Sequence, residues 1–294
     1  MINENCPLCG SQNHKVIYDV TNPKAHADIG LPGIIKICSD CQLIFKTFEN
    51  KAENLYNDNY AESFMNSKEY SGSHAVEFYK NIISDSFKRV KKNDTKPPLL
   101  DIGSGIGIML DASKETGYDP IGVELSSKLA DIALKKGHTI INKNISEFTF
   151  DKKYDTITMM DIIEHLEDPK NILMTLKPLL SAKGELIVYT PNHNSLIVKV
   201  AGLFYRLGIK SPVENIFACT HTCFFTTKTL HRALIYAGYK IREVRHFNYD
   251  TSRPGQKVSL IAKIGVSALE RIGRIIGFKP FRVVMFAQPQ LQKS

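Results

Sequence analysis

Long apolar runs are missing from this sequence. No stretch is long enough to span a bilayer, which excludes a membrane-spanning helix. An apolar export segment is also missing, because the chain opens with the polar run Met1 to Asn5. Cysteine is scarce, and without an export signal the six cysteines predict metal ligands or free thiols in place of disulfides. No internal repeat or low-complexity tract occurs. We therefore expect a globular protein of the cytoplasm.

The charge balance is basic. The formal net charge is +8 and the pI is near 9.0, which favours an anionic partner: nucleic acid, a phosphorylated metabolite or an acidic membrane surface. Much of this charge is scattered, as at Lys88 to Lys92 and Lys135-Lys136. Solvated helix faces are therefore favoured over a nucleic-acid groove.

Four cysteines have the spacing of a metal site. They form two Cys-x-x-Cys pairs: Cys6, Cys9, Cys38 and Cys41. Each pair places two thiolates on one tight turn, and two such turns close a tetrahedral site. We expect residues 1–48 to be a zinc ribbon whose Zn²⁺ is structural and takes no part in chemistry. A redox dithiol or unrelated buried cysteines is the less favoured interpretation. The apolar run Gln42 to Phe45 is expected to pack the ribbon against its neighbour.

A second group of soft ligands occurs later, in the run Cys219-Thr220-His221-Thr222-Cys223. Two aromatic residues, Phe224 and Phe225, follow directly and suggest burial. Free cysteine is among the most buried residue types, so we favour a structural role over a second metal site.

Two further parts follow the ribbon. We expect a linker or lid with an N-terminal helix over 49–92, and a larger domain over 93–294 with an amphipathic insertion near 257–276. Strand patterns alternate with helix patterns in the larger domain, which predicts an α/β fold with a parallel sheet and helices on both faces. The expected strands are 98–102, 120–124, 138–142, 154–160, 184–190, 240–246 and 281–286. The expected helices are 106–116, 126–136, 168–181 and 226–237.

A glycine-rich turn, Gly103 to Gly107, follows the first of these strands. Its three glycines let backbone N–H groups approach a ligand, and a helix N-terminus follows. Glu124 ends the next apolar segment, where a carboxylate accepts hydrogen bonds from both ribose hydroxyls. The glycine spacing is not that of a dinucleotide site, and Asp101 would repel phosphate. A phosphate-free, cationic adenosine cofactor fits these residues: S-adenosylmethionine (SAM).

Several segments closely resemble class I SAM-dependent methyltransferases. They are Leu100 to Gly107, Gly122-Val123-Glu124, Tyr154 to Ile157, Asp161 to Pro169 and Leu179 to Asn192. The resemblance spans roughly residues 75 to 247 and implies a Rossmann-like sheet with helices on both faces.

The resemblance also implies a cofactor site. The methionine part and the turn around it are assigned to Asp101, Gly103, Ser104, Gly105 and Gly107. Glu124 would bind the ribose, and Asn144 with Ile145 would lie by the adenine. Met160 and Asp161 would line the cofactor beside the acceptor pocket.

The ribbon, with the segment Tyr56 to Tyr60, is similar to bacterial zinc-ribbon methyltransferases of sugar and secondary-metabolite pathways. The sugar C-methyltransferases among them carry a further long domain beyond what this sequence has, so we expect O-methylation. Ubiquinone-pathway O-methyltransferases match at Asp161, Glu164 and His165, positions that can hold a divalent metal in that family. The implied acceptor is a small molecule or a glycan precursor.

His165 is the first candidate for a general base, because it follows the fourth strand at the edge where ligands bind in such sheets. Glu164 can orient it, or both can bind a metal that lowers the pKa of the acceptor hydroxyl. The equally favoured alternative is that Glu164 and His165 merely begin and cap the next helix. Weaker candidates for the acceptor pocket are Tyr56, Tyr60, His193 and His221.

A different class of function is a zinc-ribbon RNA methyltransferase, which the net charge of +8 would suit. Such enzymes place an Asn/Asp-Pro-Pro-Tyr type of base pocket after the fourth strand. Here Asp161 to Glu164 stand at that position and are acidic. A small-molecule acceptor is therefore favoured over nucleic acid.

A third class of function is a non-catalytic, membrane-associated adaptor, and peripheral contact with the inner face of the membrane is also possible for the enzyme. The stretch 257–276 places its apolar residues on one helical arc: Val258, Ile261, Ile264, Leu269, Ile272 and Ile276. Basic residues fall opposite, and such a helix can lie on a bilayer. Packing of this arc on the sheet is favoured, with the similar run Leu196 to Arg206 as the expected partner of the helix.

Overall fold

A computed structural model describes residues 5–21, 33–47, 73–91, 95–145, 152–217, 220–248 and 260–290. Outside these ranges lie Tyr56, Tyr60, Cys219 and residues 49–72 of the expected linker or lid. The described strands form a seven-stranded sheet and a four-stranded sheet.

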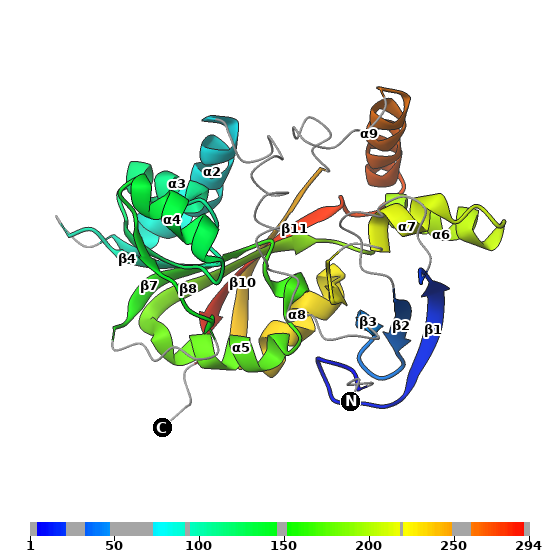
Figure 1. The fold of residues 1–294 in the computed structure, drawn as a ribbon, viewed down its shortest axis with the longest axis horizontal. Coiled ribbons are helices and arrows are strands. Elements are labelled where there is room, and N and C mark those ends of the chain that lie inside the picture. Colours follow the sequence, from blue (N-terminus) through cyan, green and yellow to red (C-terminus); the bar gives the residue numbers. More distant parts are fainter. Residues whose placement is uncertain are drawn as a thin grey trace.

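The larger sheet has the strand order β10-β11-β8-β7-β4-β5-β6 (Figure 1). Its strands are β4 (Pro98–Ile102), β5 (Asp119–Val123), β6 (Thr139–Ile141), β7 (Tyr154–Met160), β8 (Leu180–Pro191), β10 (Tyr239–Phe247) and β11 (Arg282–Pro289). All seven expected strands are therefore present. From β4 the chain adds β5 and β6 on one side and later β7 and β8 on the other. The reversal between β4 and β7 creates a crevice at their carboxyl ends, where open α/β sheets bind ligands.

The strands from β8 to β6 are parallel, as their alternation with helices predicts, whereas β11, whose direction the sequence pattern does not give, is antiparallel to both β8 and β10. Arg282, the first residue of β11, pairs with Pro191 and Phe247, the last residues of its two neighbours. The strand therefore starts at the carboxyl edge and runs back. The helix that precedes it, α9 (Leu260–Ile275), stays at that edge instead of crossing the sheet face (Figure 1).

Helices cover both faces of the larger sheet, as expected (Figure 1). On one face lie α2 (Ser73–Val90), α3 (Ile108–Thr116) and α4 (Ser127–Lys135); on the other lie α5 (Pro169–Leu176) and α8 (Thr227–Tyr236). Buried α2 and α3 side chains such as Ile83 and Met109 share a core with Ile187 of β8. Leu173 of α5 and Leu230 of α8 share the opposite core with Ile157 of β7.

The smaller sheet is the expected ribbon. It contains β1 (His14–Asp19), β2 (Ile34–Cys38) and β3 (Ile44–Thr47), all antiparallel, and is completed by β9 (Cys223–Phe224) from the distant part of the chain. Leu43 and Phe45 are fully buried in the core that contains β4, β7 and β8. The expected packing of Gln42 to Phe45 against the neighbouring domain is thus confirmed.

Three helices gather at the carboxyl edge beside the ribbon: α6 (Leu196–Arg206), α7 (Ser211–Phe217) and α9 (Figure 1). The expected partnership of α9 with α6 is confirmed, since Gly273 lies against Leu196. The expected packing of the α9 arc on the sheet is wrong for Ile264, Ile272 and Ile276, which are exposed. Among the described residues, no helix combines the length and apolarity needed to cross a membrane.

Candidate active site and metal centres

The glycine loop lies where the crevice of the larger sheet predicts a ligand. It joins β4 to α3, and Gly103, Gly105 and Gly107 all have positive φ, at 71°, 52° and 86°. A Cβ atom on Gly103 would stand 2.1 Å from the Ile162 side chain. Backbone of this kind is open to glycine and strained for other residues. Glycine is therefore needed at position 103 both for the left-handed turn and for the close approach of the Ile162 side chain to the loop backbone.

Glu124 holds the loop from the end of β5. Its carboxylate accepts hydrogen bonds from the Gly105 N–H and the Ser126 N–H, both at 2.8 Å. Burial raises the pKa of Glu124 above its ordinary value. Each carboxylate oxygen has a second lone pair, so the group still has acceptor capacity for ribose hydroxyls. The residues present thus fit an adenosine cofactor.

Asp101 points into the sheet. It is 2% exposed and accepts a hydrogen bond from the Thr158 hydroxyl at 2.7 Å. Burial raises its pKa to about 7, and the nearby Glu124 charge adds to the increase. Its assignment to the methionine part of the cofactor stays a prediction.

The remaining predicted cofactor residues reach the same edge. Ser104 is buried against Gly122, and Asn144 and Ile145 follow β6. Met160 ends β7, next to the loop strand β4. The fold therefore brings these residues to the carboxyl ends of β4, β5, β6 and β7, while their individual contacts to a cofactor stay predictions.

Asp161 follows β7 with a positive φ of 54°, which is uncommon outside glycine. Its carboxylate accepts a hydrogen bond from the Arg282 guanidinium, and both side chains are largely buried. Sequence reasoning missed Arg282, because no motif marks it. The only signal was its place at the start of the last expected strand, whose direction the sequence pattern does not give.

Glu164, His165 and His221 meet beside this pair. One ligand atom from each lies within 4.8 Å of the others. The Thr190 hydroxyl donates to Glu164 Oε2 at 2.9 Å, while Glu164 Oε1 and His221 Nδ1 are buried without a hydrogen-bond partner among the described residues. Two unsatisfied polar atoms facing one cluster fit a bound cation or an acceptor group.

Burial governs the charges in this cluster. It raises the pKa of Glu164 to about 8, with the Asp161 charge adding to the effect, so a proton or a cation neutralises Glu164 near neutral pH. Burial lowers the pKa of His165 to about 4 and that of His221 well below its ordinary value. Both imidazoles are therefore neutral near pH 7, the form that accepts a proton or binds a metal.

The capping alternative for Glu164 and His165 is wrong. They lie in a three-residue 3₁₀ helix, η4 (Ile163–His165). The next helix, α5, is capped instead by Asp168, whose side chain accepts a hydrogen bond from the Asn171 N–H at 3.0 Å. His193, a weaker candidate, is 3% exposed and packs among the rings of Phe217, Phe224 and Phe281. Its surroundings are those of a core residue.

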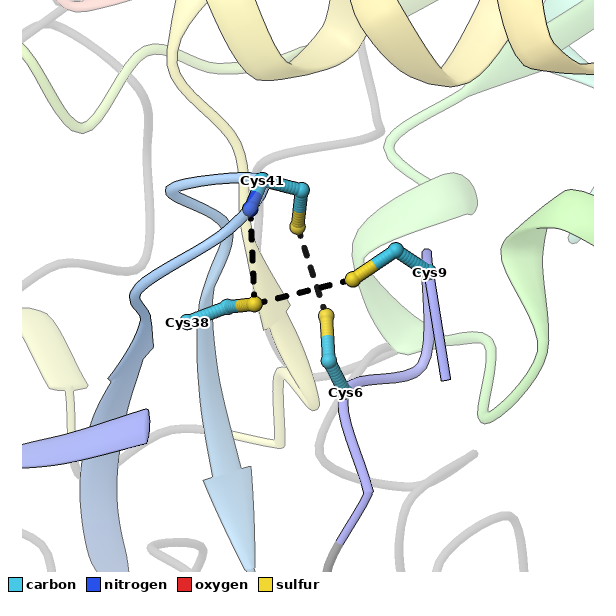
Figure 2. A group of neighbouring side chains, drawn as sticks. All are labelled: Cys6, Cys9, Cys38 and Cys41. Atoms are coloured by element: carbon cyan, nitrogen blue, oxygen red, sulfur yellow. Dashed lines mark hydrogen bonds between the residues drawn. The ribbon is translucent and has the colours of Figure 1, made fainter. Parts of the chain in front are cut away.

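The four ribbon cysteines converge as the spacing predicts (Figure 2). Cys6 Sγ lies 3.4 Å from Cys41 Sγ, and Cys9 Sγ lies 3.6 Å from Cys38 Sγ. Tetrahedral zinc with Zn–S bonds of about 2.3 Å needs sulfur atoms about 3.8 Å apart. Without a metal, the hydrogen bond from Cys41 lowers the pKa of Cys6 to about 5, whereas burial raises that of Cys9 to about 11 and the hydrogen bond to Cys6 raises that of Cys41. The geometry of the four sulfur atoms is what supports a metal. The site therefore fits Zn²⁺. Cys223, by contrast, is buried and belongs to neither of the candidate metal clusters among the described residues, consistent with its structural interpretation.

Comparison with known proteins decides the family. A family model described as a methyltransferase domain matches residues 75–244, which is more than half of the chain. The chain belongs to this methyltransferase family. The match runs from α2 to β10 and includes the glycine loop, Glu124 and the Glu164–His165–His221 cluster. The expected class I, SAM-dependent methyltransferase is thereby confirmed.

Curated relatives of this methyltransferase are ubiquinone biosynthesis O-methyltransferases. The chain is 30% identical to the one from Leptothrix cholodnii over 52% of its own length and 68% of the relative. It is 32% identical to the one from Actinobacillus pleuropneumoniae over 32% of its own length and 45% of the relative. The matched region thus spans from about half to about two thirds of these relatives.

Solved structures show the same methyltransferase fold. A SAM-dependent methyltransferase from Archaeoglobus fulgidus aligns with a TM-score of 0.51 and 22% identity over 76% of this chain and 98% of that protein. The plantazolicin methyltransferase BpumL, in complex with a triazolic desmethylPZN analog and SAH, aligns with a TM-score of 0.56 and 19% identity over 82% of this chain and 94% of that protein.

Proposed function

We propose that this methyltransferase transfers the methyl group of SAM to a hydroxyl oxygen on a small molecule or glycan precursor. The observation that carries the proposal is the meeting of Glu164, His165 and His221 beside the glycine loop. The resemblance to ubiquinone O-methyltransferases supports oxygen as the acceptor atom.

The cofactor residues are those of the loop and the strand ends. Glu124 would accept hydrogen bonds from the ribose hydroxyls while it keeps its hydrogen bond from the Gly105 N–H. The loop glycines would let the methionine part of the cofactor approach the backbone N–H groups closely. Bound SAM supplies an electrophilic methyl group on a sulfonium. Asp101, Asn144, Ile145, Met160 and Asp161 would complete the site as the resemblance implies.

His165 would take the acceptor proton. The acceptor oxygen forms a bond to the methyl carbon as the carbon–sulfur bond breaks, and the hydroxyl proton passes to the neutral imidazole. The main demand on the protein is then in-line approach at close range. Glu164 is buried while His165 and His221 are partly exposed, and Thr190 holds Glu164 in place through its 2.9 Å hydrogen bond.

Metal ions have two proposed roles. Zn²⁺ held by Cys6, Cys9, Cys38 and Cys41 would be structural. In the alternative to a His165 base, a divalent cation held by Glu164, His165 and His221 would lower the pKa of the acceptor hydroxyl, and His165 would then act as a ligand instead of taking the proton. The family resemblance would also make Asp161 a metal ligand, but its carboxylate forms an ion pair with Arg282. His221 is therefore the better third ligand.

The exposed surface of α6 and α9 supports contact with an anionic membrane at its inner face. Its largest exposed apolar side chains are Leu203, Phe204, Leu207, Ile209, Ile264, Ile272, Ile275 and Ile276. Exposed basic residues such as Arg206, Lys210 and Arg271 lie among them, while both acidic residues of α6, α7 and α9, Glu214 and Glu270, are buried. An apolar patch surrounded by positive charge is the pattern of a peripheral membrane surface.

Calorimetric titration with SAM, followed by an acceptor screen on nucleotide sugars, phenols and RNA, tests the function. We expect SAM binding and methylation of a hydroxyl compound. His165→Ala should lower turnover at least about tenfold while SAM affinity is retained. Lack of SAM binding would overturn the whole proposal, unchanged turnover would remove the role of His165, and methylation of RNA alone would replace the acceptor class.

A further inference from the structure

The ribbon sheet is completed by a strand from the methyltransferase domain. In the β3–β9 pair, Ile44 stands opposite Phe224 and Phe45 opposite Cys223. The Lys46 N–H extends the ladder by donating to the Thr222 carbonyl at 2.9 Å. Residues 220–224, which we call the connecting segment, are therefore bound directly to the ribbon.

The same segment holds the active-site helix η4 on its other side. The Thr222 N–H donates to the Glu164 carbonyl at 2.8 Å. The Thr222 hydroxyl lies 3.0 Å from the Glu164 carbonyl and 2.9 Å from the Leu166 carbonyl, one on each side of His165. The Thr220 hydroxyl lies 3.4 Å from His165 Nδ1. The connecting segment thus contacts the His165 side chain and the backbone on both sides of it.

Helix η4 needs such outside support. It contains three residues, too few to satisfy the backbone groups at its two ends from within. Its internal bonds are those from the His165 N–H to the Ile162 carbonyl and from the Leu166 N–H to the Ile163 carbonyl. The Glu164 and Leu166 carbonyls have no donor within the helix, and Thr222 supplies their hydrogen-bond donors.

The zinc-binding turns are packed into the same structure. Arg232 of α8 donates to the Cys41 carbonyl at 2.6 Å. Cys6 and Cys41 share one buried cluster with Cys223 and Leu230. Two structural links therefore join the cysteine turns to the connecting segment: strand β3 and the shared core.

We propose that Thr222 is a positioning residue through which the zinc ribbon holds His165 and His221 on the acceptor side of the active site. The glycine loop depends on other contacts: Gly103 and Ser104 donate to the Val123 carbonyl, and Gly105 to Glu124. Zinc and Thr222 therefore govern methyl transfer and leave SAM binding unchanged. The inference rests on the proposed function for the roles of the two histidines.

The first experiment compares Thr222→Val with Thr222→Ser in the full chain. Valine keeps the branched shape and removes the hydroxyl, whereas serine keeps the hydroxyl. We expect Thr222→Val to lower kcat at least about tenfold with the Kd for SAM within about twofold, and Thr222→Ser to retain kcat within about threefold. Full turnover in Thr222→Val, or equal losses in the two variants, would overturn the role of Thr222.

The second experiment needs neither an acceptor nor a substitution, so it stays informative if the proposed reaction fails or a variant does not fold. Zinc content is measured, zinc is removed from the full chain with a chelator, and amide hydrogen exchange is followed. We expect faster exchange in residues 163–167 and 220–224, unchanged exchange in 103–107, retained SAM binding by calorimetry, and reversal on return of zinc. A chain that holds no zinc, unchanged exchange in 163–167, or loss of SAM binding with zinc would overturn the coupling.

Discussion

Asp161 and Arg282 form an ion pair across the carboxyl edge of the larger sheet, between the end of β7 and the start of β11. The Arg282 guanidinium also lies 5.4 Å from the centre of the Tyr189 ring. Asp161 has a positive φ, and a non-glycine residue in such backbone costs about 1–3 kcal/mol that its surroundings must offset. Arg282 thus helps to fix the point at which β7 turns into the active site.

Replacing Arg282 should therefore harm both stability and activity. Arg282→Met leaves the largely buried Asp161 carboxylate without its guanidinium, and we expect a loss of roughly 2–4 kcal/mol in the free energy of unfolding. Arg282→Lys keeps the charge and should lose less. Denaturant titration and turnover of both variants check this. Equal stability of Arg282→Met and the wild type would show that the pair contributes nothing.

Gly103→Ala should weaken SAM binding about tenfold or more, because Gly103 has a positive φ and its Cβ would meet the Ile162 side chain. Gly208→Ala is the matched control. Gly208 also has a positive φ, at 87°, but lies in open space after α6, far along the chain from the loop. Its substitution should cost about 1 kcal/mol of stability with SAM affinity unchanged. Calorimetry compares the two, and equal SAM affinities would contradict the loop assignment.

Asp101 should make the stability of the cofactor-free protein depend on pH. Burial raises its pKa from 3.8 to about 7, so between these values the unfolded chain loses a proton that the folded protein keeps. Stability from this group is therefore greatest at low pH and falls as the pH rises towards 7. Asp101→Asn removes the titratable carboxyl group, and the amide oxygen of Asn can still accept the hydrogen bond from the Thr158 hydroxyl.

The stability of Asp101→Asn relative to wild type should accordingly improve by roughly 2–3 kcal/mol between pH 5 and pH 8. Urea unfolding at both pH values, without SAM, measures the difference. Asp119→Asn, at the exposed start of β5, serves as the control. Parallel stability changes in wild type and Asp101→Asn would show that Asp101 does not titrate in this range.

The α6–α9 surface should bind vesicles that contain anionic phospholipid and not neutral ones, because its apolar side chains are surrounded by basic residues. The double variant Leu207→Glu/Ile275→Glu should weaken sedimentation with these vesicles about tenfold or more. Leu134→Glu, on an exposed site of α4, should bind as wild type. Absence of vesicle binding in the wild type would remove the membrane proposal, and dimerisation abolished by the double variant would replace the membrane with a second copy of the chain.

The sequence by itself determined the features that depend on local spacing. The two Cys-x-x-Cys pairs, the glycine loop with Glu124 and the alternation of strands and helices are each readable over a few residues, because tight turns and helical or strand periodicity are set by neighbours in the chain. These patterns predicted the ribbon, the cofactor edge and His165 as a site residue.

Tertiary structure decided what depends on segments far apart in the sequence. His221 joins Glu164 and His165 because β9 pairs with the ribbon, and Arg282 reaches Asp161 because β11 runs antiparallel from the carboxyl edge. The sequence shows the amphipathic pattern of α9, but whether its apolar side chains contact the sheet or solvent depends on the position of the helix in the fold. Strand register and helix placement arise from the packing of the whole core, which no local pattern in the sequence contains.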